Sequence, residues 1–238
     1  MMQNKYKGKY FSVLGDSIST LEGYSEPDDA VYYDISRKLS SGVLTPSYTW
    51  WGQVIEYLGG ELLVNNSFSG STVTWHPLYE IKSYGCSKKR TSALGREDVT
   101  PDVIMVYMGV NDWGSGTRIY YDEQFDCDRN TPALFSVAYK KMLDGLKEKY
   151  PEAEIWCMTL PISRCDARED FKFPYCHGGR HIEEYCKVIR DCAEKTGARV
   201  IDLYASCEPF DTVDCFHPNA DGMRTISNAI IRELSKNG

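Results

Sequence analysis

Four short segments of this chain carry the residue types that acyl transfer needs. They are Gly15-Asp16-Ser17-Ile18, residues 65–70, Gly109-Val110-Asn111-Asp112 and Asp214-Cys215-Phe216-His217. Ser17 supplies a hydroxyl that can act as a nucleophile, and His217 supplies an imidazole that can take its proton. Asp214 precedes His217 by three residues and can fix the tautomer of its ring. These residues predict a catalytic serine, base and orienting acid.

Three groups in the same segments can donate hydrogen bonds to an oxyanion: the N–H of Ser17, the N–H of Gly70 and the side-chain amide of Asn111. Donors of this kind stabilise the negative charge of a tetrahedral intermediate. Each segment by itself is weak evidence, because serine caps, loop glycines, Asn-Asp turns and Asp-x-x-His matches are common. The combination is far rarer, and it predicts the complete chemistry of an ester-cleaving site.

Apolar runs that alternate with helical patterns predict the elements that position these segments. Strands are expected at 10–14, 61–64, 103–108, 155–160 and 200–203, and helices at 50–58, near 91–94, from 131, around 185–193 and at 219–235. Such alternation is typical of an α/β sandwich with a mainly parallel sheet. Ligands bind these sheets beyond the carboxyl ends of the strands. Because each of the four segments follows a predicted strand, we expect them to meet at this edge.

The chain resembles the SGNH hydrolases, also called the GDSL esterase/lipase family, in these four segments and in their order. Ile18 stands where the family name has leucine, which is a conservative change. The resemblance implies a flavodoxin-like, three-layer α/β/α sandwich with a five-stranded, mainly parallel sheet. It further implies one SGNH/GDSL hydrolase domain over residues 1–238, which hydrolyses esters without a metal or another cofactor.

The resemblance also assigns a role to each candidate residue. The catalytic triad falls on Ser17, His217 and Asp214. The oxyanion hole falls on Ser17, Gly70 and Asn111. Asp16 matches a motif position, and we expect it to shape the turn after the first strand rather than to react.

Charge and hydropathy exclude several other classes of protein. The 27 basic and 34 acidic side chains give a net charge of −7, which does not favour nucleic acid or an anionic membrane as a partner. No run of apolar residues approaches the roughly 18 that a membrane span needs. The expected partner is a small-molecule ester, and the oligomeric state is left open.

The N-terminal apolar run and the cysteines bear on location. Residues 10–14 form a run that is too short for the apolar core of a signal peptide, although the sequence would not show a leader that had been removed. The nine cysteines are odd in number and include no Cys-x-x-Cys pair, and several lie in apolar periodic segments, where a reduced cysteine acts as a small hydrophobic residue. We therefore expect a reducing compartment and a cytoplasmic location.

Other interpretations use some of the same residues. His177 and His181 have a metal-ligand spacing, but Gly178 and Gly179 between them disfavour a rigid helix, so no metal is predicted. The favoured function is a serine esterase for small acyl esters, above all acetyl esters, including carbohydrate-linked ones. A non-catalytic flavodoxin-like binding module stays open, as does a thioesterase or lysophospholipase that uses the same triad. Among the loop aromatics, Trp113 is the one expected to reach the substrate.

Overall fold

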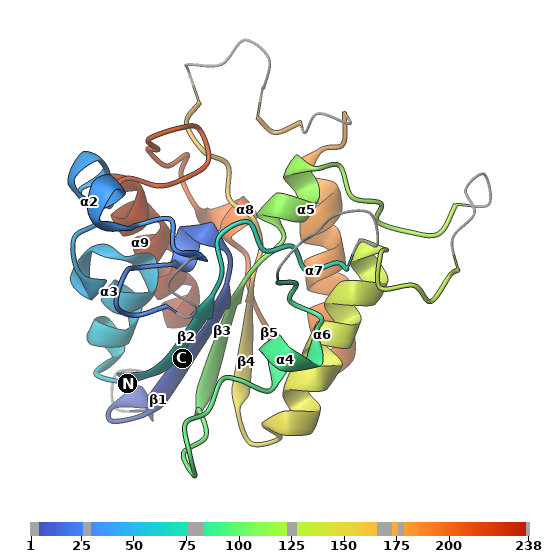
Figure 1. Cartoon of the computed structure of the whole chain (residues 1–238), viewed down its shortest axis with the longest axis horizontal. Helices are drawn as coiled ribbons and strands as arrows, with labels where there is room; N and C mark the ends of the chain where they lie inside the picture. The colour runs from blue at the N-terminus through green and yellow to red at the C-terminus, as the bar shows by residue number, and fades with distance from the viewer. Residues whose placement is uncertain are drawn as a thin grey trace.

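A five-stranded parallel sheet lies at the centre of the molecule (Figure 1). The computed structural model describes residues 5–25, 30–75, 83–122, 128–165, 173–175 and 179–236. Its strands are β1 (Tyr10–Gly15), β2 (Glu61–Ser67), β3 (Val103–Tyr107), β4 (Glu154–Met158) and β5 (Arg199–Ile201). They are ordered β2-β1-β3-β4-β5, and every neighbouring pair is parallel. This is the flavodoxin-like order, so the predicted sheet is confirmed.

Helices cover both faces of the sheet. The described helices are η1 (Ser17–Ser19), α2 (Ile35–Ser41), η3 (Pro46–Tyr48), α3 (Trp50–Leu58), α4 (Lys88–Thr91), α5 (Val110–Gly114), α6 (Phe135–Lys149), α7 (Ile182–Thr196), α8 (Leu203–Ser206) and α9 (Ala220–Lys236). In Figure 1, α3 and α9 lie side by side on one face, and α6 and α7 lie side by side on the other. The molecule is therefore the three-layer α/β/α sandwich that the sequence predicts.

The sequence patterns explain why the main elements form. Every residue of β3 is buried, as expected for a central strand that is covered on both faces. The apolar stripe of α6 faces inward, with Ala138 and Met142 fully buried. Gly59 and Gly197 follow α3 and α7 in left-handed conformations, with φ of 69° and 65°. Glycine adopts this conformation at little cost, which is why both helices end where predicted.

Several predicted boundaries differ from the structure, and for two of them the physical reason is clear. β2 does not end at residue 64 but continues to Ser67, because its polar end is buried in side-chain hydrogen bonds: Asn65 Nδ2 donates to the carbonyl oxygen of Ser19 at 2.8 Å. The helix predicted from residue 131 begins at Phe135. The N–H groups of Phe135 and Ser136 donate to backbone carbonyls of residues 118 and 119, and they replace the cap expected from the sequence.

Several short helices lie outside the segments for which a helix is predicted. One of them is α5, where the fully buried ring of Trp113 holds one helical turn against the core. The segment 21–48 contains α2 and η3. Asp34 caps α2 by accepting hydrogen bonds from the N–H groups of Ser36 and Arg37. All three helices are short and lack a long apolar period, so hydropathy does not reveal them.

Among the residues that the structure describes, five cysteines are free and two form a disulfide. Four free thiols are buried, as the apolar context predicts: Cys86, Cys157, Cys186 and Cys192. Cys165 and Cys215 form a disulfide across a sequence separation of 50 residues. Disulfides are typical of oxidising compartments, so this bond weighs against the reducing compartment expected from the cysteine pattern. The cytoplasmic location stays a prediction. Within the described part of the chain, no helix is long and apolar enough to cross a membrane.

Candidate active site

The turn after β1 places Ser17 at the carboxyl edge of the sheet. Gly15 ends the strand, and a Cβ atom there would lie 2.5 Å from Cβ of Ser19 and 2.7 Å from Oγ of Ser67, so only glycine fits. Asp16 caps η1 by accepting a hydrogen bond from the N–H of Ile18 at 3.0 Å. Ser17 is the first residue of η1. Asp16 thus shapes the turn after β1, as predicted from its place in the motif.

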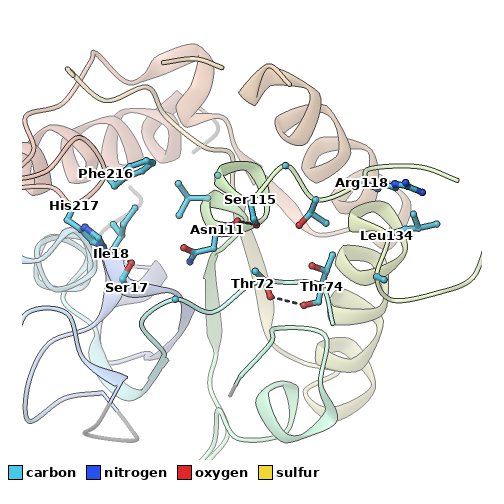
Figure 2. Close-up of a pocket in the computed structure, with 16 residues that line it drawn as sticks. Ser17, Ile18, Thr72, Thr74, Asn111, Ser115, Arg118, Leu134, Phe216 and His217 are labelled. Atoms are coloured by element: carbon cyan, nitrogen blue, oxygen red, sulfur yellow. Dashed lines mark hydrogen bonds between the residues drawn. The ribbon is translucent and has the colours of Figure 1, made fainter. Parts of the chain in front are cut away.

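Ser17, His217 and Asp214 form one line of hydrogen bonds. His217 Nε2 lies 2.8 Å from Ser17 Oγ, and His217 Nδ1 lies 2.7 Å from Asp214 Oδ2. The serine and the histidine are 200 residues apart in the sequence and come together because the loop before α9 returns to the end of β1. Figure 2 shows the two side chains at the same end of a cleft. In this geometry the imidazole can take the proton of the serine hydroxyl.

Asp214 is held by hydrogen bonds at both carboxylate oxygens. Oδ1 accepts from the N–H groups of Phe216 and His217 at 3.1 and 2.8 Å. Oδ2 accepts from His217 Nδ1 and from the hydroxyl of Tyr32, the latter at 2.9 Å. Burial alone would raise the pKa of Asp214, but the hydrogen bonds from His217 and Tyr32 outweigh it and hold the pKa well below its usual range. The carboxylate is therefore ionised at neutral pH.

Gly70 and Asn111 lie beside Ser17 in the cleft. Gly70 has a φ of +79°, a left-handed conformation that favours glycine. Asn111 projects from α5, and its Nδ2 donates to the carbonyl oxygen of Ser71 at 2.8 Å. This bond uses one of the two amide hydrogens and holds the chain next to Gly70 against α5. The three predicted oxyanion donors thus border one space, and their catalytic roles stay predictions.

The cleft has a volume of about 770 Å³ and extends well beyond the serine. Ser17 and His217 lie at one end, and Arg118 and Leu134 lie at the other (Figure 2). The wall between them is rich in hydroxyl groups: Thr72, Thr74, Ser115 and Thr117. The space is large enough for a small organic ligand.

Buried Arg90 supports this edge, and nothing in the sequence singled it out. Its guanidinium donates to the carbonyl oxygens of Gly15 and Asn66 at 2.9 and 2.7 Å and to Ser71 Oγ at 2.9 Å. Burial lowers the pKa of Arg90 to about 10, despite the nearby carboxylate of Asp16, so the side chain is charged at neutral pH. It connects the ends of β1 and β2.

Asp112, next to Asn111, fixes the far wall of the cleft. Its carboxylate accepts from the N–H of Val73 at 2.7 Å, and from the N–H and the hydroxyl of Thr74 at 3.1 and 2.7 Å. Burial raises its pKa to about 6. Asn-Asp pairs are common in turns, and the buried role of the aspartate becomes visible only with the fold.

Trp113 and His181 do not line the cleft. Trp113 was expected to reach the substrate, but its ring is fully buried and packs against Phe173 and Phe216, whereas Phe216 itself lines the cleft. His181 caps α7, where its Nδ1 accepts from the N–H of Glu183 at 3.1 Å, and His177 lies outside the described residues. Among the residues that the structure describes, no group of three His, Cys, Asp or Glu side chains is placed to hold a metal ion.

A parallel α/β sheet with a hydrogen-bonded serine, histidine and aspartate at its carboxyl edge is an arrangement typical of serine hydrolases. A family model described as GDSL-like lipase/acylhydrolase matches residues 9–169. The chain therefore belongs to this family, the SGNH hydrolases, as its resemblance predicts. The matched residues include Ser17, Gly70 and Asn111, while Asp214 and His217 lie beyond them.

Solved structures agree with the family and the fold. A protein described as a GDSL-like lipase from Bacteroides ovatus is 27% identical with a TM-score of 0.71, over 97% of this chain and 99% of that one. Another from Bacteroides uniformis is 27% identical with a TM-score of 0.69, over 96% of each chain. A carbohydrate acetylesterase from Sinorhizobium meliloti shares the fold, with 13% identity and a TM-score of 0.63 over 97% of this chain and 100% of that one. A comparison with curated proteins found no significant match.

Proposed function

We propose that this chain is a serine esterase that removes small acyl groups, above all acetyl groups, from hydroxyl-rich alcohols such as carbohydrates. One observation carries the proposal. The line of hydrogen bonds from Ser17 Oγ through His217 to Asp214 Oδ2 begins at a cleft that also contains Gly70 and Asn111. A nucleophile, a base, an orienting acid and oxyanion donors are the parts that ester hydrolysis without a cofactor requires.

The proposed mechanism has two half-reactions. Ser17 Oγ attacks the ester carbonyl carbon while His217 Nε2 takes the hydroxyl proton. The carbonyl oxygen becomes an oxyanion, which accepts hydrogen bonds from the N–H groups of Ser17 and Gly70 and from Asn111 Nδ2. The intermediate collapses as the bond to the alcohol oxygen breaks, and His217 gives its proton to the departing alcohol. Water then attacks the acyl-enzyme with His217 as base, which releases the acid and restores Ser17.

The hydroxyl groups of the cleft support a polar alcohol. Thr72 Oγ1 donates to the carbonyl oxygen of Thr74 at 2.7 Å, and Thr74 Oγ1 donates to Asp112 Oδ1 at 2.7 Å. Ser115 Oγ donates to the carbonyl oxygen of Asn111. Because these hydroxyl hydrogens are used within the protein, the oxygens offer lone pairs to a ligand. Hydroxyl donors of a sugar match such acceptors. The likeness to the Sinorhizobium meliloti carbohydrate acetylesterase supports the same choice.

Ester hydrolysis and active-site labelling test the proposal together. Wild-type protein should hydrolyse p-nitrophenyl acetate and bind a fluorophosphonate covalently, and Ser17→Ala should lose both reactions while its circular dichroism is unchanged. Ser235→Ala, at an exposed serine of α9, should keep both. A Ser17→Ala variant that still cleaves the ester would exclude Ser17 as nucleophile. A non-catalytic binding module would show neither reaction in any variant.

A substrate series tests the acyl and alcohol parts. We expect kcat/KM to fall as the acyl chain of p-nitrophenyl esters lengthens from acetate to decanoate, and peracetylated monosaccharides to release acetate. Higher kcat/KM for decanoate than for acetate would contradict the preference for small acyl groups. Absence of acetate release from every acetylated sugar would contradict the carbohydrate-type alcohol.

A further inference from the structure

Tyr32 contacts two members of the hydrogen-bonded line, His217 and Asp214. Its ring stacks on the imidazole of His217, with ring centroids 3.4 Å apart and planes 9° from parallel. Its hydroxyl donates to Asp214 Oδ2 at 2.9 Å, and the same oxygen lies 2.7 Å from His217 Nδ1. One side chain thus contacts both the ring plane of the base and the oxygen that orients it.

The backbone around Tyr32 is bound to the turns that carry the serine and the histidine. The N–H of Tyr32 donates to Thr20 Oγ1 at 2.9 Å, and the Thr20 hydroxyl donates to the carbonyl oxygen of Ser17 at 2.8 Å. The fully buried Tyr33 donates its hydroxyl to the carbonyl oxygen of Pro218 at 2.7 Å. The pair Tyr32–Tyr33 therefore connects the chain at Ser17 with the chain just after His217.

The charges around Tyr32 keep its hydroxyl a donor. Burial and the hydrogen bond to Asp214 raise the pKa of Tyr32 well above its usual value, so the phenol is neutral at neutral pH. The guanidinium of Arg37 lies 4.8 Å from the centre of the Tyr32 ring and pairs with Asp34 at 3.2 Å. Tyr32 does not belong to the residues that line the cleft, so contact with the substrate does not explain its position.

We propose that Tyr32 is a positioning residue for the base: its stacked ring fixes the plane of the His217 imidazole, and its hydroxyl shares Asp214 Oδ2 with His217 Nδ1. The proposal rests on the proposed esterase function. The ring restricts rotation of the imidazole, which keeps Nε2 directed at Ser17 Oγ. The hydroxyl withdraws charge from Oδ2, which weakens the attraction between the carboxylate and the imidazolium that forms during the reaction.

Two substitutions at Tyr32 separate the ring from the hydroxyl. Tyr32→Leu removes both, and we expect kcat for p-nitrophenyl acetate to fall by about 10²-fold, since misplaced catalytic groups cost rates of this order. We expect KM to stay within about twofold, because a group that orients the base acts mainly on the chemical step. Tyr32→Phe keeps the stacked ring and should restore most of kcat. Without the hydroxyl, Asp214 favours the imidazolium more, so the acid limb of the kcat/KM profile should move to higher pH.

Tyr24→Leu is the matched control. Tyr24 is 47% exposed, contacts Trp51 with ring centroids 6.2 Å apart, and precedes η3 in the same stretch of chain as Tyr32. Its substitution should leave kcat and the pH profile unchanged. Equal losses of kcat in Tyr24→Leu and Tyr32→Leu would overturn the proposal, as would a Tyr32→Leu variant that loses only thermal stability or changes only KM. Identical pH profiles for wild type and Tyr32→Phe would overturn the role of the hydroxyl.

A measurement that needs no turnover keeps this proposal separate from the proposed function. The proton of His217 Nδ1 in its bond to Asp214 should give a low-field ¹H NMR signal, identified by its absence from His217→Ala. Tyr32→Phe should shift this signal, because the carboxylate oxygen loses its second donor. An unchanged signal would overturn the role of the hydroxyl even in an active enzyme. A wild-type protein that cleaves no ester would instead contradict the esterase function. The change of the His217 proton signal in Tyr32→Phe would still test the contact between Tyr32 and Asp214.

Discussion

The guanidinium of Arg90 donates to the carbonyl oxygen of Gly15 at 2.9 Å, although the two residues are 75 positions apart. Gly15 directly precedes the Asp16–Ser17 turn. The same guanidinium contacts Asn66 and Ser71 on the segment that contains Gly70. A single buried cation thus fixes the distance between the turn of the nucleophile and the loop of one oxyanion donor.

Arg90→Lys should destabilise the protein and slow the reaction. An ammonium group cannot reproduce the planar set of donors, so buried carbonyl oxygens lose their partners, at a cost of about 1–3 kcal/mol each. Urea unfolding followed by circular dichroism should show the lower free energy of unfolding, and kcat should fall because Gly70 shifts relative to Ser17. Arg96→Lys, at an exposed arginine, should stay within about 0.5 kcal/mol of wild type. Equal stability of the two variants would contradict the role of Arg90.

Sequence alone predicts most of the fold because its signals are strong and local. The continuous apolar run of β3 and the glycines after α3 and α7 have direct physical meanings, and the structure agrees with them. Strand and helix ends that depend on distant partners were predicted at the wrong residues. The start of α6 is set by carbonyls of residues 118 and 119, and the end of β2 is set by polar contacts with Ser19. Neither contact can be inferred from spacing along the chain.

The candidate site likewise contains residues that the sequence predicts and residues that only the fold reveals. Ser17, Gly70, Asn111 and His217 belong to short patterns, and the structure brings them to one cleft. Arg90 and Tyr32 belong to no such pattern. Each supports the site through a partner far away in the sequence: Arg90 bonds to Gly15, 75 residues away, and Tyr32 to Asp214, 182 residues away. Trp113 was misplaced because an aromatic next to a site residue can face the core as easily as the cleft. The direction of a side chain on a single helical turn can be determined only when the three-dimensional path of the chain is known.

Asn111→Ala should lower kcat by about 10²–10³-fold, with little change in KM, because the loss of one oxyanion donor has an effect of this size. Part of the loss comes from the hydrogen bond to the Ser71 carbonyl, which Asn111→Asp also removes while it adds a negative charge. Asn111→Asp should therefore be at least as impaired. Steady-state kinetics with p-nitrophenyl acetate measures both variants, with Asn130→Ala, at an exposed residue, as control. An unchanged kcat in Asn111→Ala would exclude the amide from the oxyanion hole.

The pH dependence of stability should report the buried carboxyl of Asp16. Burial raises its pKa from 3.8 to about 7, so between these values the folded state binds more protons than the unfolded state. Stability should therefore decrease as pH rises through this range. Asp112, with its pKa raised to about 6, acts in the same direction.

Asp16→Asn should make this decrease shallower, because an amide does not titrate between pH 4 and pH 8. The amide oxygen can still accept the hydrogen bond of the cap, so the turn is kept. Urea midpoints measured from pH 4 to pH 8 test the effect. Asp102→Asn is the control: hydrogen bonds from Lys9 and Tyr10 outweigh burial and lower the pKa of Asp102, so its contribution changes only below the range of interest. A slope that is the same in wild type and Asp16→Asn would show that Asp16 does not carry a raised pKa.

The Cys165–Cys215 disulfide should stabilise the turn that carries Asp214 and His217. Cys215 lies inside that turn, where its carbonyl oxygen also accepts a hydrogen bond from Ser163 Oγ at 2.6 Å. The double variant Cys165→Ser/Cys215→Ser should lose about 2–4 kcal/mol of unfolding free energy, because the unfolded chain is no longer restrained by the cross-link. Reduction of the wild-type protein with dithiothreitol should reproduce this loss and should not affect the double variant further. If dithiothreitol destabilised both proteins equally, the effect would come from some other part of the chain, and the disulfide would not be what holds the turn.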